Sequence, residues 1–196
     1  MWTELELDGW LLHIEEKESD DDMDVMAKLY FAPNRISIRG ERALMNVLHP
    51  EGSKRFIVNV SLVIMDTPRE DDYLHGETIH LAELYNYVTL APQDELNDVL
   101  RQFRLSRSIF YRLGKKMLCA VLQSLLDSGR ISLDDIVGLE ADGSFTSNEG
   151  IPDRVPLAHY YQRHYGFVSD IPLNSPIYNA IPMRADVQRI LEHCHR

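Results

Sequence analysis

The most informative stretch of the sequence is Pro156-Leu157-Ala158-His159-Tyr160-Tyr161-Gln162-Arg163-His164-Tyr165-Gly166-Phe167. Four of its side chains recur at i, i+3, i+4 and i+7, the spacing that places residues on one face of an α-helix: Leu157, Tyr160, Tyr161 and His164. Gly166 stands where a left-handed residue commonly ends a helix. An apolar run, Ile136–Ala141, precedes this stretch. The sequence therefore predicts a strand, a loop, a tyrosine-rich helix and a further strand that begins at Gly-Phe.

Further upstream, apolar residues alternate with polar ones, as is typical of strands that bury one face. The extended segments that we predict are Trp10–Ile14, Met26–Ile38 with a break at Pro33-Asn34, Phe56–Ile64, Ile79–Val88, Ile136–Ala141 and parts of Val168–Met183. The acidic run Glu18–Asp24 separates the first two, and we expect it to be a solvated loop. It lacks the glycine and the final glutamate of a calcium loop, so we predict no metal there.

Helical periodicity appears mainly in the second half of the chain. The predicted helices are Asp94–Leu105, Met117–Leu126, Leu157–His164 and Val187–Cys194. With 196 residues, 44% of them hydrophobic, the chain is long enough for one domain with a substantial core. We therefore predict a single α/β (α+β) domain over residues 1–196, with a mixed, mostly antiparallel sheet flanked by helices.

The formal net charge of −11 argues against nucleic acid as a partner, because binding to phosphate backbones needs a broad positive surface. Such a charge favours the approach of a cationic small molecule or a basic peptide, although acidity also serves solubility alone. One segment departs from the trend, because Arg101–Lys116 contains no acidic residue. This basic strip is either an anion-binding segment or a solvated helix face.

Several classes of protein lack support in the sequence. No run of eighteen apolar residues and no secretory signal occurs, so we expect a cytoplasmic protein with no membrane partner. Cys119 and Cys194 are too few for a disulfide framework, and we expect both to be free structural thiols. His193-Cys194-His195 cannot by itself close a metal site. Hydrolase, dithiol and nucleotide-triphosphatase motifs are also absent from the sequence.

The order of strand, loop, tyrosine-rich helix and Gly-Phe resembles the closing segment of the GNAT superfamily of N-acetyltransferases. The resemblance covers roughly Ile79–Met183. It implies a single GNAT-like domain whose sheet is splayed open between two central strands, with acetyl-CoA wedged into the opening. The implied reaction is direct transfer of the acetyl group to a primary amine, on a small molecule or a basic peptide, by a monomer or homodimer.

The resemblance also implies where the cofactor's pyrophosphate binds. Glycine before a helix lets phosphate oxygens reach backbone N–H groups. Such a glycine, Gly114, precedes the predicted amphipathic helix, and the cofactor-binding residues implied are Arg112, Leu113, Gly114, Lys115 and Lys116. The family's pattern is Gln or Arg, two residues, Gly, one residue, then Gly or Ala, and here Tyr111 and Lys116 occupy the outer positions. The alternative is therefore a catalytically inactive GNAT-like module that binds CoA or a protein.

Tyr161 is the implied general acid, because a phenol can protonate the departing thiolate. Its spacing to Gly166 is one residue longer than is usual in the family, so Tyr160 is an alternative. Both tyrosines could also simply pack the helix on the sheet. Glu83, a carboxylate within an apolar strand, is the implied base for the amine, and Glu140 in the next strand is the second candidate.

Overall fold

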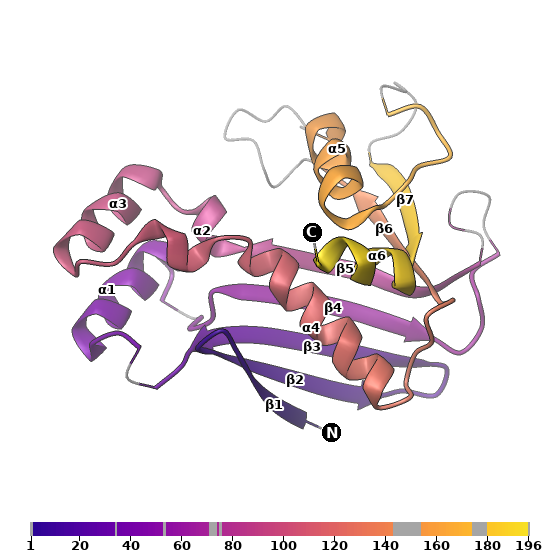
Figure 1. The fold of residues 1–196 in the computed structure, drawn as a ribbon, viewed down its shortest axis with the longest axis horizontal. Helices are drawn as coiled ribbons and strands as arrows, with labels where there is room; N and C mark the ends of the chain where they lie inside the picture. Colours follow the sequence, from indigo (N-terminus) through magenta and orange to yellow (C-terminus); the bar gives the residue numbers. More distant parts are fainter. Residues whose placement is uncertain are drawn as a thin grey trace.

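The computed structural model describes residues 2–33, 35–52, 54–70, 74, 76–142, 154–173 and 180–195. Its centre is a seven-stranded sheet in which the strands lie side by side in chain order (Figure 1). The strands are β1 (Trp2–Leu7), β2 (Trp10–Glu18), β3 (Asp22–Phe31), β4 (Val58–Met65), β5 (Glu77–Asn86), β6 (Ile136–Ala141) and β7 (Ile181–Asp186). Neighbours are antiparallel except β5 and β6, which are parallel. The predicted mixed, mostly antiparallel sheet is confirmed.

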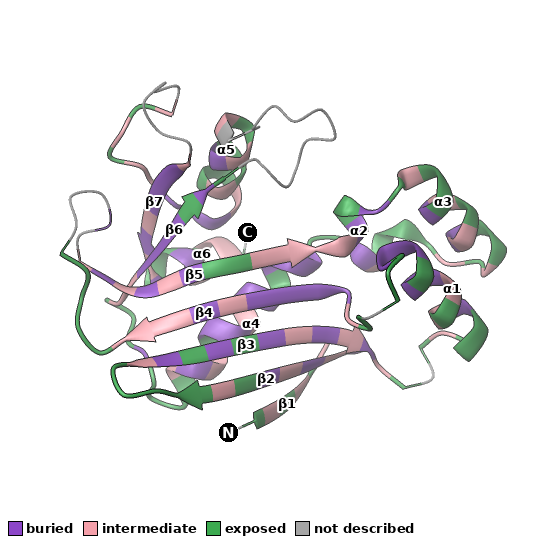
Figure 2. Cartoon of the chain, turned by 180° about the vertical axis from the view of Figure 1, so that it is seen from behind, coloured by how far each residue is buried: buried purple, intermediate pink, exposed green. Residues whose placement is uncertain are grey.

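The helices in the described residues are α1 (Ile38–Leu48), α2 (Tyr87–Leu90), α3 (Gln93–Gln102), α4 (Leu113–Asp127), α5 (Arg154–Tyr165) and α6 (Val187–Cys194), with a 3₁₀ turn at Arg107–Phe110. Helix α4 crosses one face of the sheet and packs on β4 and β5 (Figure 1). From behind, strands β1–β5 lie in front of α4, and α1, α2 and α3 gather at one end (Figure 2).

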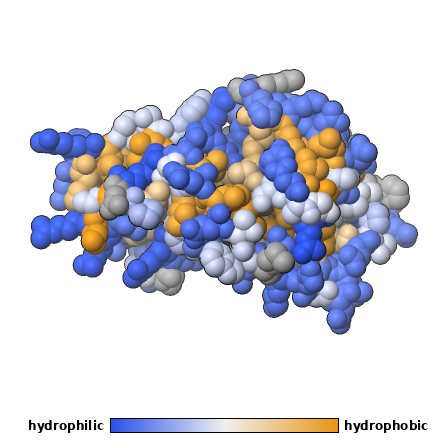
Figure 3. Space-filling model, turned by 60° about the horizontal axis from the view of Figure 1, so that its bottom comes forward, coloured by the Kyte–Doolittle hydropathy of each residue, from blue (hydrophilic) through white to orange (hydrophobic). Residues whose placement is uncertain are grey.

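The core lies between α4 and the covered face of the sheet. Strand β2 illustrates the principle, because Trp10, Leu12 and Ile14 are almost fully buried while the residues between them are not. β2 pairs with β3 along its whole length, from Trp10↔Phe31 to Glu18↔Met23. Apolar side chains also reach the surface among hydrophilic ones (Figure 3), and the large exposed ones include Trp2, Ile38 and Tyr111.

Two predicted segments are corrected at the N-terminal side, and one strand there was missed. The predicted acidic loop is shorter, because β3 already begins at Asp22. The extended segment predicted to reach Ile38 ends at Phe31, because Ser37 caps α1 by accepting a hydrogen bond from the Gly40 N–H. Strand β1 was not predicted, although it alternates and ends at Asp8-Gly9, whose positive φ values suit a two-residue hairpin.

The expectation of free thiols is wrong. Cys119 in α4 and Cys194 in α6 form a disulfide. They are 75 residues apart in the chain, and only the packing of α6 against α4 brings them together. The C-terminal helix is therefore covalently joined to the helix that crosses the sheet.

The pairing of β5 with β6 is short. It runs from Glu77↔Ile136 to His80↔Gly138 and is irregular between Glu77 and Ile79. β5 then continues beside β4 to Asn86, and β6 continues beside β7 to Ala141. The C-terminal halves of the two strands consequently diverge (Figure 2).

Candidate functional site

The diverging halves of β5 and β6 form two walls of a pocket of about 530 Å³, a volume typical of small-molecule sites. Helix α5 and the start of α4 complete it. The lining residues that bear on chemistry are His80, Glu83, Tyr85, Gly114, Glu140, Asp142, Tyr160, Tyr161 and Tyr165. The structure therefore brings Glu83, Gly114 and Tyr161, predicted from distant parts of the sequence, to one cavity.

The start of α4 is open toward this cavity. Arg112 is the N-cap residue, in a left-handed conformation (φ 55°), and its side chain makes no capping hydrogen bond. Gly114 follows within the first turn, where a Cβ atom would lie 3.7 Å from Leu84 Cδ1 and 3.8 Å from Tyr165 Oη. A helix start of this kind presents N–H groups and the positive end of the helix dipole to the pocket.

A second pocket of about 540 Å³ adjoins the first, and both are lined by Gly114 and Tyr160. Its walls include Arg107, Arg112, Lys115 and His164. Burial lowers the pKa of His164, and the positive charges of Arg112, Lys115 and Arg163 lower it further. The space beside the α4 start is therefore a region of positive potential in an acidic protein.

The predicted cofactor residues do not all lie there. Leu113 is buried in the core, and Lys116 forms an ion pair with Asp8 at 2.5 Å. Neither lines the two pockets. Helical geometry explains the difference, because consecutive residues of a helix point about 100° apart, so a run of five cannot face one ligand. Arg112, Gly114 and Lys115 are the members that the fold keeps together.

Helix α5 supplies three tyrosines to the first pocket. Tyr161 is largely enclosed, and burial is the main cause that raises its pKa to about 12. No hydrogen bond engages its hydroxyl within the described residues. Tyr160 is 44% exposed and lines both pockets. Gly166 ends the helix at φ +79°, as predicted.

Tyr165 is the tyrosine that sequence reasoning missed. It is 1% exposed, and burial raises its pKa well above the usual value for a phenol. The predicted helix face also shifts, because Ala158 and Tyr165 are buried in place of Tyr160 and His164. The position of Tyr165 directly before Gly166, which ends the helix, was the sequence feature that could have indicated a further aromatic side chain lining the pocket.

Glu83 lies in β5 beyond a bulge. The pairing with β4 runs Ser61↔Glu83 and then Leu62↔Leu81, so Ala82 is the extra residue. The Glu83 carboxylate accepts a hydrogen bond from Asn59 Nδ2 at 2.7 Å. Glu140, the second candidate, lines the same pocket from β6. Both carboxylates therefore face the cavity.

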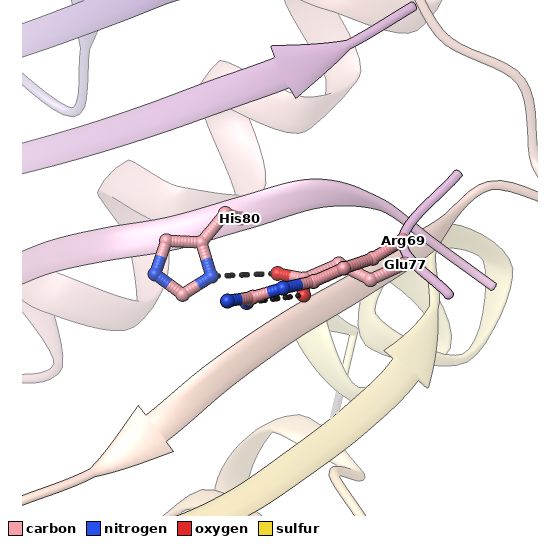
Figure 4. Close-up of polar contacts among 3 residues, drawn as sticks. All are labelled: Arg69, Glu77 and His80. Carbon is pink, nitrogen blue, oxygen red and sulfur yellow. Dashed lines mark hydrogen bonds and ion pairs between the residues drawn. The ribbon is translucent and has the colours of Figure 1, made fainter. Parts of the chain in front are cut away.

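His80 was also missed. It lines the pocket from β5, and its Nδ1 lies 2.6 Å from Glu77 Oε1 (Figure 4). The sequence contains this pair as Glu77-x-x-His80. Such spacing does not predict a contact in a strand, and here the local irregularity in β5 brings the two side chains together.

No protein family, curated protein or solved structure matches this chain. Among the residues that the structure describes, no helix is both long and apolar enough to span a membrane. The same residues contain no group of three or more His, Cys, Asp or Glu side chains placed to hold a metal ion.

Proposed function

We propose that this chain is an acetyl-CoA-dependent N-acetyltransferase with a GNAT-like fold, which moves the acetyl group directly to a primary amine. The observation that carries the proposal is the pocket at the divergence of β5 and β6. There a helix start without a side-chain cap, a half-buried phenol and a carboxylate meet in one cavity. Each of these groups suits a different part of the transfer reaction.

The pyrophosphate would bind at the start of α4. Gly114 leaves room for phosphate oxygens to approach the backbone, and Arg112 and Lys115 line the adjoining pocket as cations. The pantetheine arm would lie between β5 and β6, whose facing edges are unpaired beyond His80 and Gly138. The bulge at Ala82 would place a backbone N–H near the thioester carbonyl, where a donor stabilises developing negative charge.

Tyr161 and Glu83 would carry the proton transfers. Because burial raises the pKa of Tyr161 to about 12, the phenol stays protonated at neutral pH and can donate to the departing thiolate. Glu83 would take a proton from the acceptor ammonium before attack. Positioning both reactants in one cavity supplies the remainder of the catalysis.

The acceptor would be cationic. Glu83, Glu140 and Asp142 line the same cavity, and tyrosine rings surround them. Carboxylates attract an ammonium group, and aromatic faces add cation–π attraction. A small-molecule amine and the amino group of a basic peptide both fit this description.

One observation favours the alternative of a module that binds CoA without turnover. Tyr111 is 63% exposed at a position where the family pattern has Gln or Arg, and Lys116 is held by Asp8. Only part of the expected phosphate-binding set therefore remains at the site. Acetyl-CoA binding without transfer to any amine would identify such a module.

The test is transfer of labelled acetyl from acetyl-CoA to a panel of primary amines containing spermidine, tyramine, lysine methyl ester and a lysine-rich peptide. We expect at least one acceptor, and Tyr161→Phe should lower kcat by roughly 10²-fold or more while cofactor binding is kept. Tyr30→Phe is the matched control, because Tyr30 lies in β3 and lines neither pocket. Full activity of Tyr161→Phe would contradict its role as the acid.

A further inference from the structure

A buried charge network sits at the point where β5 and β6 part. The Glu77 side chain is 0% exposed, its Oε2 lies 3.2 Å from Arg69 Nη1, and its Oε1 lies 2.6 Å from His80 Nδ1 (Figure 4). Arginine has donors and no acceptor, so it favours a Glu77 carboxylate that accepts from both partners. His80 therefore donates through Nδ1–H, and in the neutral imidazole with this tautomer the lone pair is on Nε2.

Backbone hydrogen bonds and a glycine hold this network in place. The Arg69 N–H donates to the Glu77 carbonyl at 2.8 Å, and the Gly76 N–H donates to the Arg69 carbonyl at 2.9 Å, which fixes Arg69 beside Glu77. Across the parallel pair, Gly138 provides the space for the carboxylate. A Cβ atom at this position would lie 2.5 Å from Glu77 Oε1.

His80 presents its second nitrogen to the pocket. The imidazole lines the cavity and its side chain is 27% exposed. Nε2 points away from Glu77 in Figure 4 and has no hydrogen-bond partner among the described residues. His80 and Glu83 pair with Val63 and Ser61, two residues apart in β4, so the bulge places both on the same face of the sheet.

We propose that His80 is a second base of the transfer reaction, oriented by Glu77 and Arg69 as positioning residues. The proposal rests on the N-acetyltransferase function proposed above. An acceptor ammonium must lose two protons to become an amide, and Glu83 takes the first. His80 Nε2 takes the second, from the nitrogen that has just attacked the thioester carbonyl.

The step balances as follows. The amine lone pair forms the C–N bond, Nε2 removes a proton from that nitrogen, and the C–S bond then breaks with its electron pair on sulfur. Tyr161 protonates the thiolate. Of the two protons held by Glu83 and His80, one restores Tyr161 and the other passes to water, so each turnover releases one proton. The same arrangement of carboxylate, Nδ1–H and reactive Nε2 operates in serine proteases.

Titratable and charged groups from each neighbouring element share the pocket with His80 or belong to its charge network. They are Arg69 before β5, Glu77, Glu83 and Tyr85 in β5, Glu140 and Asp142 in and after β6, and Tyr160, Tyr161 and Tyr165 in α5. The pH dependence of the parent alone therefore cannot be assigned to His80, and the pH profiles of the parent and the variants have to be compared.

The experiment measures kcat/KM for acetyl-CoA and spermidine, or the best acceptor of the panel, between about pH 5 and pH 8, where imidazole titrates. In the parent protein, kcat/KM should rise with pH. His80→Gln should lower it by roughly 10²-fold or more and remove this rise, while acetyl-CoA still raises the melting temperature. His13→Gln is the matched control, because His13 pairs with Glu4 on β1 and β2, outside the pocket.

The positioning role has its own readout. Imidazole ¹⁵N spectra of the parent should show His80 protonated at Nδ1 and not at Nε2. This preference should weaken in Glu77→Gln, whose amide can turn its NH₂ group toward the imidazole, and should persist in the more exposed variant Arg69→Gln, which keeps the acceptor carboxylate. A parent that transfers acetyl while His80→Gln keeps both rate and pH profile overturns this proposal alone, as does an Nε2–H tautomer in the parent. A parent that transfers nothing overturns the proposed function and this proposal together.

Discussion

Strands β2, β3 and β4 differ from the pair β5 and β6 in how completely their backbones are joined. β2 and β3 pair along the whole of β2, whereas β5 and β6 pair from Glu77 to His80 and then part. The first region buries apolar side chains on its covered face. In the second, the two strands open a cavity that polar side chains enter.

The buried polar residues follow this difference. Those in the described part of the chain are His49, Asn59, Glu77 and Lys115. Glu77 stands at the beginning of the short segment that pairs β5 with β6, Asn59 donates a hydrogen bond to Glu83, and Lys115 lies in the first turn of α4. Buried polar groups reduce stability unless they are partnered, and functional sites are where proteins retain them. The comparison indicates that the first region maintains the fold, and the second is where we propose that the chemistry takes place.

The largest expected effect on stability comes from a comparison of two leucine substitutions. Leu29→Ala in β3 should lower the free energy of unfolding by about 2–5 kcal/mol, because Leu29 is 0% exposed and leaves a cavity. Leu84→Ala in β5 should cost less than half as much, because Leu84 is half-buried and already borders open space. Urea unfolding of both variants measures the two costs. Equal costs would show that the second region is as tightly packed as the first.

Two glycines sharpen the comparison within the site. Gly138→Ala should cost about 1–3 kcal/mol, because the new methyl group would lie 2.5 Å from Glu77 Oε1 and displace a buried carboxylate. Gly114→Ala should be neutral or stabilising by about 0.4–1 kcal/mol, because its contacts at 3.7 and 3.8 Å are ordinary and the residue is helical. Thermal unfolding distinguishes them. A larger loss at residue 114 would mean that the start of α4 is closed rather than open.

Much of the fold was predictable because apolar spacing is a local property. The alternation in Phe56–Ile64 marks β4, and the spacing in Met117–Leu126 marks most of α4. Helix α1 was not predicted because its capping residue, Ser37, comes only a few residues after β3 and Pro33, so the segment read as extended chain. Tyr87 and Val88 continue an apolar strand pattern, yet Asn86 caps α2 at that point. Capping hydrogen bonds set the starts of both helices, and the spacing of apolar residues does not reveal such bonds.

The candidate site was predictable where a residue type carried its own chemistry. Gly114, Glu83 and Tyr161 were singled out by the GNAT resemblance together with the chemistry of their side chains or backbone, and the structure places all three on one cavity. Lys116 could not be placed, because its partner Asp8 is more than a hundred positions away. The disulfide partner Cys194 depends on long-range packing in the same way. His80 was missed for another reason, because a local irregularity in β5 brings it to Glu77.

A smaller effect should appear at the basic side of the site. The pKa of His164 lies below its usual value because of burial and the charges of Arg112, Lys115 and Arg163. Pyrophosphate or CoA bound beside α4 adds negative charge, so this pKa should rise. NMR titration of the imidazole measures it. The pKa of His49, which is lowered mainly by burial, should not change, because His49 lines neither pocket. If the pKa of His164 is the same with and without the ligand, the anion binds elsewhere.

The most direct test of the central claim is the melting temperature of the protein with and without acetyl-CoA. A ligand at a hundred times its Kd adds about 2.7 kcal/mol to the native state. We predict a rise of several degrees in the parent protein and no rise in Gly114→Glu, whose carboxylate would occupy the phosphate position. An unchanged melting temperature in the parent, or an equal rise in Gly114→Glu, would contradict the claim that acetyl-CoA binds where β5 and β6 diverge.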